Sequence, residues 1–222
     1  DNAHVVIGGG GLLDHRKYLP ILETFCQRRK EGFIKKLVVW GAGTNAHFRR
    51  ECMSLYNEKV TETLLKSADL VGLRDPDSPF EYTPCPSCLS STFNNPKEPT
   101  LDIVCYEHES IHLPFELNCP KMLNTDPSNM KEAIEFLSSS HTVFTNTFHG
   151  AYWSLLLGRR VISVPFSTKF NSLEGVLGYE ALGPDTDFHS RNQASLSTLY
   201  KEECISLNKS FHRKFMGLIH GS

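Results

Sequence analysis

Short apolar runs alternate along the chain with longer segments whose apolar residues recur at helical spacing. In the first half, the runs that indicate buried strands are residues 5–7, 37–40 and 70–73. The segments between them that indicate helices are residues 18–32 and 60–65. Strands that alternate with helices in this way predict a parallel sheet covered by helices.

The second half repeats this alternation after a polar segment. Residues 90–100 are rich in Ser, Asn and Pro, which makes them the best candidate for a linker. The strands predicted beyond it are residues 101–106, 142–145 and 161–164. The predicted helices are residues 130–137, 150–157, 169–179 with an interruption at Gly175, and a long amphipathic helix over 197–219. The fold class is therefore α/β, with two halves joined near residue 95.

The turn between residues 145 and 150 holds the most informative chemistry of the chain. It follows a predicted buried strand, precedes a predicted helix, and contains one titratable group, His149. Open α/β sheets bind ligands at the carboxyl ends of their strands, and a helix N-terminus offers backbone N–H groups to an anion. The pattern equally fits a histidine that only caps the helix or fills the turn.

Four consecutive glycines, Gly8 to Gly11, follow the first predicted strand. They do not form a dinucleotide-binding fingerprint, because Leu13 stands where the third glycine belongs. Such a run lets backbone N–H groups approach an anion or a sugar. The alternative is a strand-to-helix turn that needs positive φ angles.

Two basic residues stand where strands are predicted to end. Arg74 follows an apolar strand, and its guanidinium suits a carboxylate or a phosphate. It equally suits an ion pair with Asp75 or Asp77. Lys169 comes shortly after the last strong strand, where it supplies a point charge to a site or is simply a solvated lysine.

The composition narrows the class of protein. A net charge of −2 lacks the basic excess of a nucleic-acid-binding protein, and no apolar run is long enough to span a membrane. No signal peptide is visible, so we expect a cytoplasmic location. The alternative is the lumen of the secretory pathway after removal of a leader or anchor, for which Asn208 offers one glycosylation sequon.

The seven cysteines give no metal-site pattern. Only Cys85 and Cys88 have C-x-x-C spacing, and a tetrahedral zinc site needs a second pair of ligands. We therefore expect thiols in a reducing compartment and no metal.

Four segments in order resemble the polysaccharide pyruvyltransferase family. They are residues 5–13, 37–45, 71–78 and 143–165, the last with its His149-Gly150 pair and its Leu157-Gly158-Arg159 ending. The resemblance implies two Rossmann-like halves in a glycosyltransferase-B-like arrangement, residues 1–95 and 96–222, with a cleft between them. It also implies a strand and a helix before the glycine-rich segment, so we expect the N-terminal half to be incomplete.

The resemblance further implies transfer of a pyruvyl group from phosphoenolpyruvate to a sugar hydroxyl of a glycan. In that reaction His149 would act as general acid or orient the donor, and Arg74 and Lys169 would neutralise the donor's charge. The resemblance thus implies phosphoenolpyruvate as the donor substrate, and no further cofactor is expected. The other substrate-binding residues that this comparison suggests are Gly9, Gly10, Gly11, Asn45, Asn146 and Thr147.

The chain also departs from the family pattern. Many members carry an arginine two residues before the histidine, where this chain has Thr147, and an acidic residue in the turn occupied by Pro84-Cys85-Pro86. Two alternatives therefore stay open. One is a metal-independent glycosyltransferase that uses a nucleotide sugar, and the other is a non-catalytic glycan-binding relative.

Overall fold

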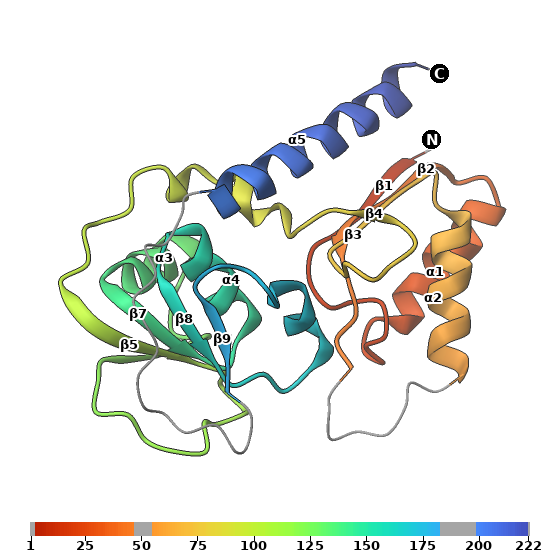
Figure 1. Ribbon diagram of the computed structural model, residues 1–222. Coiled ribbons are helices and arrows are strands. Elements are labelled where there is room, and N and C mark those ends of the chain that lie inside the picture. Colours follow the sequence, from red (N-terminus) through yellow and green to blue (C-terminus); the bar gives the residue numbers. More distant parts are fainter. Residues whose placement is uncertain (1–2, 47–54, 183–198, 222) are drawn as a thin grey trace. The chain divides into compact units, whose positions relative to one another are not determined.

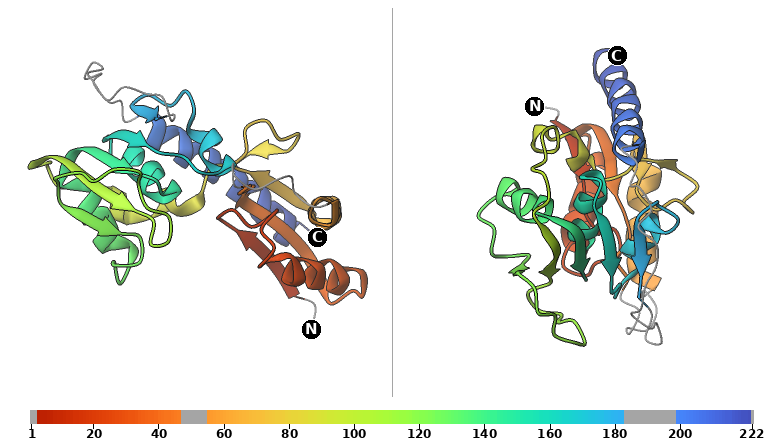
Figure 2. Two further views of the ribbon diagram at one scale, coloured as in Figure 1. Left: turned by 90° about the horizontal axis from the view of Figure 1, so that it is seen from below. Right: turned by 60° about the vertical axis from the view of Figure 1, so that its left-hand side comes forward.

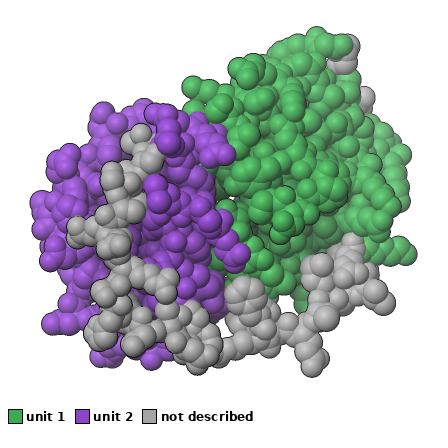
Figure 3. Space-filling model, in the orientation of Figure 1, with its two compact units in different colours: residues 1–89, 167–172, 204–222 green, residues 90–166, 173–203 purple. Residues whose placement is uncertain are grey.

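The computed structural model describes residues 3–46, 55–182 and 199–221, and it divides the chain into two compact units (Figure 3). Unit 1 comprises residues 1–89, 167–172 and 204–222. Unit 2 comprises residues 90–166 and 173–203. The chain thus enters unit 2 at Ser90, within the predicted linker, and returns to unit 1 twice.

Unit 1 is built on a four-stranded parallel sheet (Figure 1). Its strands, in spatial order, are β1 (Ala3–Gly8), β2 (Ile34–Ala42), β3 (Leu70–Leu73) and β4 (Glu81–Tyr82). Helices α1 (Leu19–Lys30) and α2 (Leu55–Ser67) pack against each other, and the 3₁₀ turn η1 (Pro86–Leu89) ends the first segment. Leu22, Leu37, Val39 and Leu64 are buried between sheet and helices, as the apolar runs predict.

The long helix α5 (Leu199–His220) completes the core of unit 1 from the far end of the chain. Phe211 is fully buried, and its ring lies 5.2 Å from that of Trp40. Gly72 leaves room for it, since a Cβ there would lie 2.5 Å from Phe211 Cε2. Asn208 is also fully buried, accepts a hydrogen bond from Trp40 Nε1 at 2.8 Å and donates to Pro84 O at 3.1 Å. The Asn208 sequon therefore has no room for a glycan in folded unit 1.

Unit 2 contains a five-stranded parallel sheet (Figure 2). Its strands, in spatial order, are β6 (Lys121–Leu123), β5 (Leu101–Glu107), β7 (Ser140–Thr145), β8 (Arg160–Ser163) and β9 (Tyr179–Ala181). The connecting helices are α3 (Met130–Ser138) and α4 (Phe148–Leu156), and the 3₁₀ turn η2 spans Ser91–Phe93. Strand β7 is central in this sheet, so the turn that carries His149 follows the middle strand.

Local sequence explains where the helices of unit 2 begin and end. Asn129 caps α3 by accepting the N–H of Glu132 at 3.1 Å, and Ser128 in turn donates to the Glu132 carboxylate. Helix α4 is followed by Gly158 at φ 68°, a left-handed conformation that favours glycine and ends the helix.

The two parallel sheets confirm the predicted α/β fold with Rossmann-like halves. The predicted helix over 169–179 is wrong in its second part. The 3₁₀ turn η3 (Thr168–Leu173) ends before Gly175 and Gly178, whose φ angles of 80° and 87° break the helix, and strand β9 begins at Tyr179. None of the described helices is both long and apolar enough to cross a membrane.

Candidate functional site

In unit 2, the turn after β7 is organised by two threonines. Thr145 Oγ1 donates to the carbonyl of Tyr106 at 2.5 Å and accepts the N–H of Thr147 at 2.9 Å. Thr147 Oγ1 then accepts the N–H of Gly150 at 2.9 Å, which makes Thr147 the N-cap of α4. The sequence therefore starts the helix at Phe148 and places His149 in its first turn.

Gly150 follows the histidine because the helix packs very closely at this point. A Cβ on Gly150 would lie 2.5 Å from both Thr145 Oγ1 and Thr147 Oγ1, and 2.7 Å from Tyr106 Cδ1. Any larger residue would push α4 away from β5 and β7. The glycine of the histidine-glycine pair is thus a packing requirement as well as part of a sequence signature.

The imidazole of His149 is partly buried and held between aromatic rings. It stacks on Trp153, one helical turn later, with centroids 4.7 Å apart and an interplanar angle of 24°. The ring of Phe148 meets it edge-on at 5.6 Å. These contacts fix the ring at the end of the central strand, where a proton donor or acceptor can act on a bound ligand.

Asn146 and Thr147, both predicted to bind substrate, use their side chains inside unit 2. Asn146 is 1% exposed, accepts the N–H of His108 at 2.8 Å, and donates to the carbonyl of Ile111 at 2.5 Å. Thr147 is 4% exposed and caps α4. Their contact with a substrate stays a prediction.

In unit 1, Arg74 lies at the carboxyl end of β3 and is 2% exposed. Its backbone N–H donates to the carbonyl of Ala42 at 3.0 Å, and its side-chain Nη2 donates to the carbonyl of Thr44 at 3.2 Å. The side chain therefore crosses the ends of neighbouring strands and joins the turns that follow them.

The glycines of these turns make room for the arginine. A Cβ on Gly43 would lie 2.7 Å from Arg74 Cγ, and one on Gly11 would lie 3.2 Å from Arg74 Nη2 and 2.4 Å from Asn45 Cβ. Gly9 and Gly10 instead have φ angles of 63° and 78°, which favour glycine. Backbone conformation and packing thus account for these glycines, and their contact with substrate stays a prediction.

Two carboxylates surround this arginine. Asp75 Oδ2 accepts the N–H of Thr44 at 2.8 Å, and Asp14 Oδ1 accepts the N–H of Asn45 at 2.7 Å. Burial raises the pKa of Asp14, against the effect of the Asn45 N–H, and Asp75 raises it further. Burial lowers the pKa of the Arg74 guanidinium, which the charges of Asp75, Cys85 and Asp14 oppose. Unit 1 thus holds a charged cluster of the buried residues Arg74 and Asp14 and the partly exposed Asp75.

Lys169 joins this cluster from a distant part of the sequence. Its neighbour Thr168 donates its N–H to the carbonyl of Ala46 at 2.9 Å, and Thr168 Oγ1 accepts the N–H of Ala46 at 3.0 Å. Burial, together with the positive charge of Arg74, lowers the pKa of Lys169 to about 8. Lys169 is partly exposed, so it is the cation of the cluster that solvent and ligands reach most readily.

Sequence reasoning placed Arg74, Asn45 and the glycines in the first half and Lys169 in the second, whereas the structure places Lys169 in unit 1 with them. It missed Asp14 and Trp153. Asp14 lies three residues after the last glycine of the run, and Trp153 lies four residues after His149, so the sequence position of each could have pointed to it. Asn45 Oδ1 is buried without a hydrogen-bond partner among the described residues. No group of three or more His, Cys, Asp or Glu side chains in the described ranges is arranged to hold a metal ion. Cys52 lies outside these ranges.

A comparison with protein families finds one whose model covers the turns described above. The family model described as polysaccharide pyruvyl transferase matches residues 2–167, well over half of the chain. The match covers the glycine turns, Arg74 and His149, and it ends two residues before Lys169. No curated protein and no solved structure matches the chain. On the family match, the chain belongs to the polysaccharide pyruvyl transferase family.

Proposed function

We propose that this protein transfers a pyruvyl group from phosphoenolpyruvate to a sugar hydroxyl of a glycan. The family is one of transferases, and its description supports a polysaccharide acceptor. The observation that carries the proposal is the placement of His149, a partly buried imidazole stacked on Trp153 in the first turn of α4. A helix N-terminus there favours the negative charge of the donor.

In the proposed reaction, the acceptor hydroxyl oxygen bonds to C2 of phosphoenolpyruvate while a proton is added to C3. The bond between C2 and the phosphate oxygen then breaks, and inorganic phosphate leaves. His149 supplies the proton as general acid or holds the leaving phosphate, because an imidazole exchanges protons near neutral pH. A second hydroxyl of the same sugar then closes the ketal at C2. Of the two protons that the hydroxyls lose, one replaces the proton given to C3 and the other leaves on the phosphate.

The donor carries carboxylate and phosphate charges that need cations. Lys169 suits this role best because it is partly exposed and its charge is poorly solvated, so an anion would stabilise it. Arg74 is buried, close to Asp14 and Asp75. It would hold the Gly11 and Gly43 turns in place and attract the donor through its positive charge. The reaction draws on no further cofactor in this proposal.

The test measures phosphate release from phosphoenolpyruvate in the presence of a panel of glycans. We expect turnover by the wild-type protein, and a loss of about 10²–10⁴-fold in His149→Ala and His149→Gln with an unchanged melting temperature. Full turnover by His149→Ala would contradict the role of the histidine. A melting-temperature panel of phosphoenolpyruvate, nucleotide sugars and free sugars separates this function from a nucleotide-sugar glycosyltransferase and from a glycan-binding protein without catalysis.

A further inference from the structure

Unit 2 has a pocket of about 320 Å³ between the linker that enters the unit and helix α3. The side chains that give it its chemistry are Ser91, Asn95 and Lys97 from the linker, and Lys131, Ile134 and Glu135 from α3. The pocket also borders Ser138, the last residue of α3, shortly before β7 begins. His149 follows the opposite end of β7, so this pocket is separate from the candidate catalytic turn.

Two contacts hold the linker wall of the pocket against the rest of unit 2. Phe93 is 1% exposed, so its ring anchors the turn η2 in the core. Further along, Arg159 Nη2 donates to the carbonyl of Lys97 at 2.7 Å and to the carbonyl of Ser138 at 3.1 Å. Arg159 thereby joins the linker to the end of α3, and the two walls of the pocket are in place before a ligand binds.

Two lysines and one carboxylate determine the charge of the pocket. Lys97 Nζ lies 3.8 Å from Glu135 Oε2, and Lys131 Nζ lies 3.9 Å from Glu135 Oε1. Both distances exceed the length of a hydrogen bond, and the two lysine side chains are 69% and 74% exposed. Each ammonium group therefore has N–H donors to offer a ligand, and the three side chains together carry one net positive charge.

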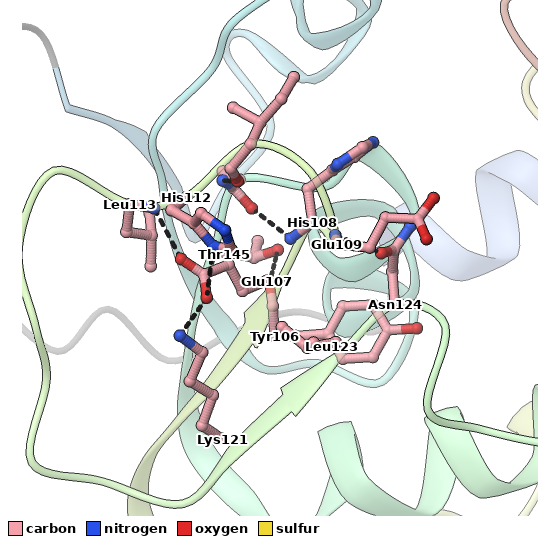
Figure 4. Close-up of polar contacts among 12 residues, drawn as sticks. Tyr106, Glu107, His108, Glu109, His112, Leu113, Lys121, Leu123, Asn124 and Thr145 are labelled. Atoms are coloured by element: carbon pink, nitrogen blue, oxygen red, sulfur yellow. Dashed lines mark hydrogen bonds and ion pairs between the residues drawn. The ribbon is translucent and has the colours of Figure 1, made fainter.

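Another pair of a lysine and a glutamate in unit 2 shows the contrast (Figure 4). Glu107 is 1% exposed, accepts the N–H of Leu113 at 2.6 Å and pairs with Lys121. The Glu107 carboxylate is thus enclosed and satisfied by the protein itself, which makes this pair structural. Glu135 and its two lysines instead face solvent at the mouth of a pocket.

The uncharged groups of the pocket suit a sugar. Asn95 is exposed, and neither its side-chain amide nor the Ser91 hydroxyl bonds to another group in the part of the chain that the structure describes. An amide and a hydroxyl each donate and accept hydrogen bonds, as the hydroxyls of a sugar do. Ile134 is 3% exposed and offers an apolar contact at the base of the pocket. The volume lies at the lower end of the range of ligand sites, about 300–1,000 Å³, and suits a ligand of the size of a sugar unit.

We propose that this pocket is a second glycan site, which binds a sugar unit that carries a carboxylate. The carboxylate lies between Lys97 and Lys131 and replaces Glu135 as their partner, while the ring hydroxyls bond to Ser91 and Asn95. A uronic acid and a pyruvyl ketal both supply such a carboxylate. The site binds the polymer away from the reacting sugar, so the inference goes beyond the proposed function and does not depend on it.

The test titrates small probes against the whole protein by saturation-transfer NMR, without phosphoenolpyruvate. The acidic probes are methyl β-glucuronide and a methyl galactoside that carries a pyruvyl ketal. The controls are methyl β-glucoside, which has the ring without the carboxylate, and acetate, which has the carboxylate without the ring.

Three variants change the charge of the pocket: Lys97→Gln, Lys131→Gln and Glu135→Gln. Lys97→Gln keeps the backbone carbonyl to which Arg159 bonds, so the linker wall stays in place. Lys209→Gln is the matched control, because Lys209 is an exposed lysine of α5 and belongs to unit 1.

We expect wild type to bind at least one acidic probe more tightly than it binds methyl β-glucoside or acetate, and the tighter acidic probe identifies the source of the carboxylate. Lys97→Gln and Lys131→Gln should each weaken this binding about two- to fivefold, as expected for exposed ion pairs. Glu135→Gln should strengthen it by a similar factor, because the competing carboxylate is removed. Lys209→Gln should leave it unchanged.

Absence of binding of both acidic probes, an equal affinity for acetate, or an equal loss in Lys209→Gln would each overturn the inference. Weaker binding in Glu135→Gln would also overturn it, since Glu135 would then hold the ligand rather than compete with it. Binding with the expected pattern, in a protein that releases no phosphate from phosphoenolpyruvate, would contradict only the proposed function.

Discussion

Thr147 Oγ1 accepts the N–H of Gly150 at 2.9 Å, so the residue that stands in place of the family's arginine caps the helix that carries His149. A cap of this kind satisfies a backbone donor that would otherwise lack a partner inside the helix. Thr147 therefore has a structural role in this chain, independent of any role in binding the donor.

The first prediction concerns this cap. Thr147→Val keeps the shape of the side chain but removes the acceptor, so it should lower the free energy of unfolding by about 1–2 kcal/mol. Thr147→Ser keeps the acceptor and should stay close to wild type. Thr147→Arg loses the cap in a buried place and should be at least as unstable as Thr147→Val. Urea unfolding measures all three, and wild-type stability in Thr147→Arg would show that the cap contributes little.

The second prediction concerns the contribution of Arg74 to stability. Arg74→Ala leaves the buried Asp14 and the nearby Asp75 without their cation, and removal of one partner from a buried charged group costs about 3–5 kcal/mol. The loss should be smaller at pH 5 than at pH 7.5, because Asp14 has a raised pKa and protonates more readily.

A double-mutant cycle provides the control for Arg74. Asp14→Asn removes one of the two carboxylate charges near Arg74, so Arg74→Ala should cost less in that background than in wild type. Additive losses, measured by urea unfolding, would mean that the two side chains do not interact.

The third prediction follows from the pKa of Lys169, which burial and Arg74 lower to about 8. Below pH 8 the ammonium is charged and attracts the donor, and above pH 8 it loses its proton. The affinity for phosphoenolpyruvate should therefore fall as the pH rises through 8. Calorimetry at pH 8 in buffers of different ionisation enthalpy should show proton uptake, because a bound anion raises the pKa of the lysine. Lys169→Arg, which stays charged, should lack this step, and a retained step in that variant would assign it to another group.

The same lysine should lower stability at neutral pH. Its pKa in the folded protein lies below the ordinary value of 10.5, so the unfolded chain binds more protons between pH 8 and 10.5. Stability from this group is therefore least below pH 8 and rises toward pH 10.5. Lys169→Met should raise the melting temperature at pH 7 while it abolishes the shift with phosphoenolpyruvate. A lower melting temperature would show that Lys169 stabilises its surroundings.

Much of the fold follows from local sequence, whereas the neighbours of the site residues do not. Apolar runs located the long strands, and Gly158 located the end of α4, because these features act within a few residues. Strands β4, β6 and β9 have only two or three residues and show no periodicity. The neighbour of Lys169, Thr168, pairs with Ala46 in a tertiary contact, and no local pattern encodes such a contact.

The fourth prediction tests the reason for a glycine in the turn after β2. Gly43→Ala would place a methyl group 2.7 Å from both Arg74 Cγ and Asp75 Oδ1, so we expect a loss of about 1–3 kcal/mol. Gly8→Ala is the matched control at the end of β1, since its nearest neighbour would be Trp40 O at 3.7 Å. Equal melting temperatures of the two variants would contradict the packing explanation.

The C-terminal helix has a consequence for the order in which the protein folds during synthesis. Phe211 and Asn208 complete the core of unit 1 around Trp40 and Pro84, although Asn208 lies 168 residues after Trp40 and 124 residues after Pro84. A ribosome releases the N-terminal strands long before it releases α5. The core of unit 1 therefore lacks Asn208 and Phe211 until all of unit 2 has been synthesised. Unit 1 is synthesised first, but its core is completed after that of unit 2.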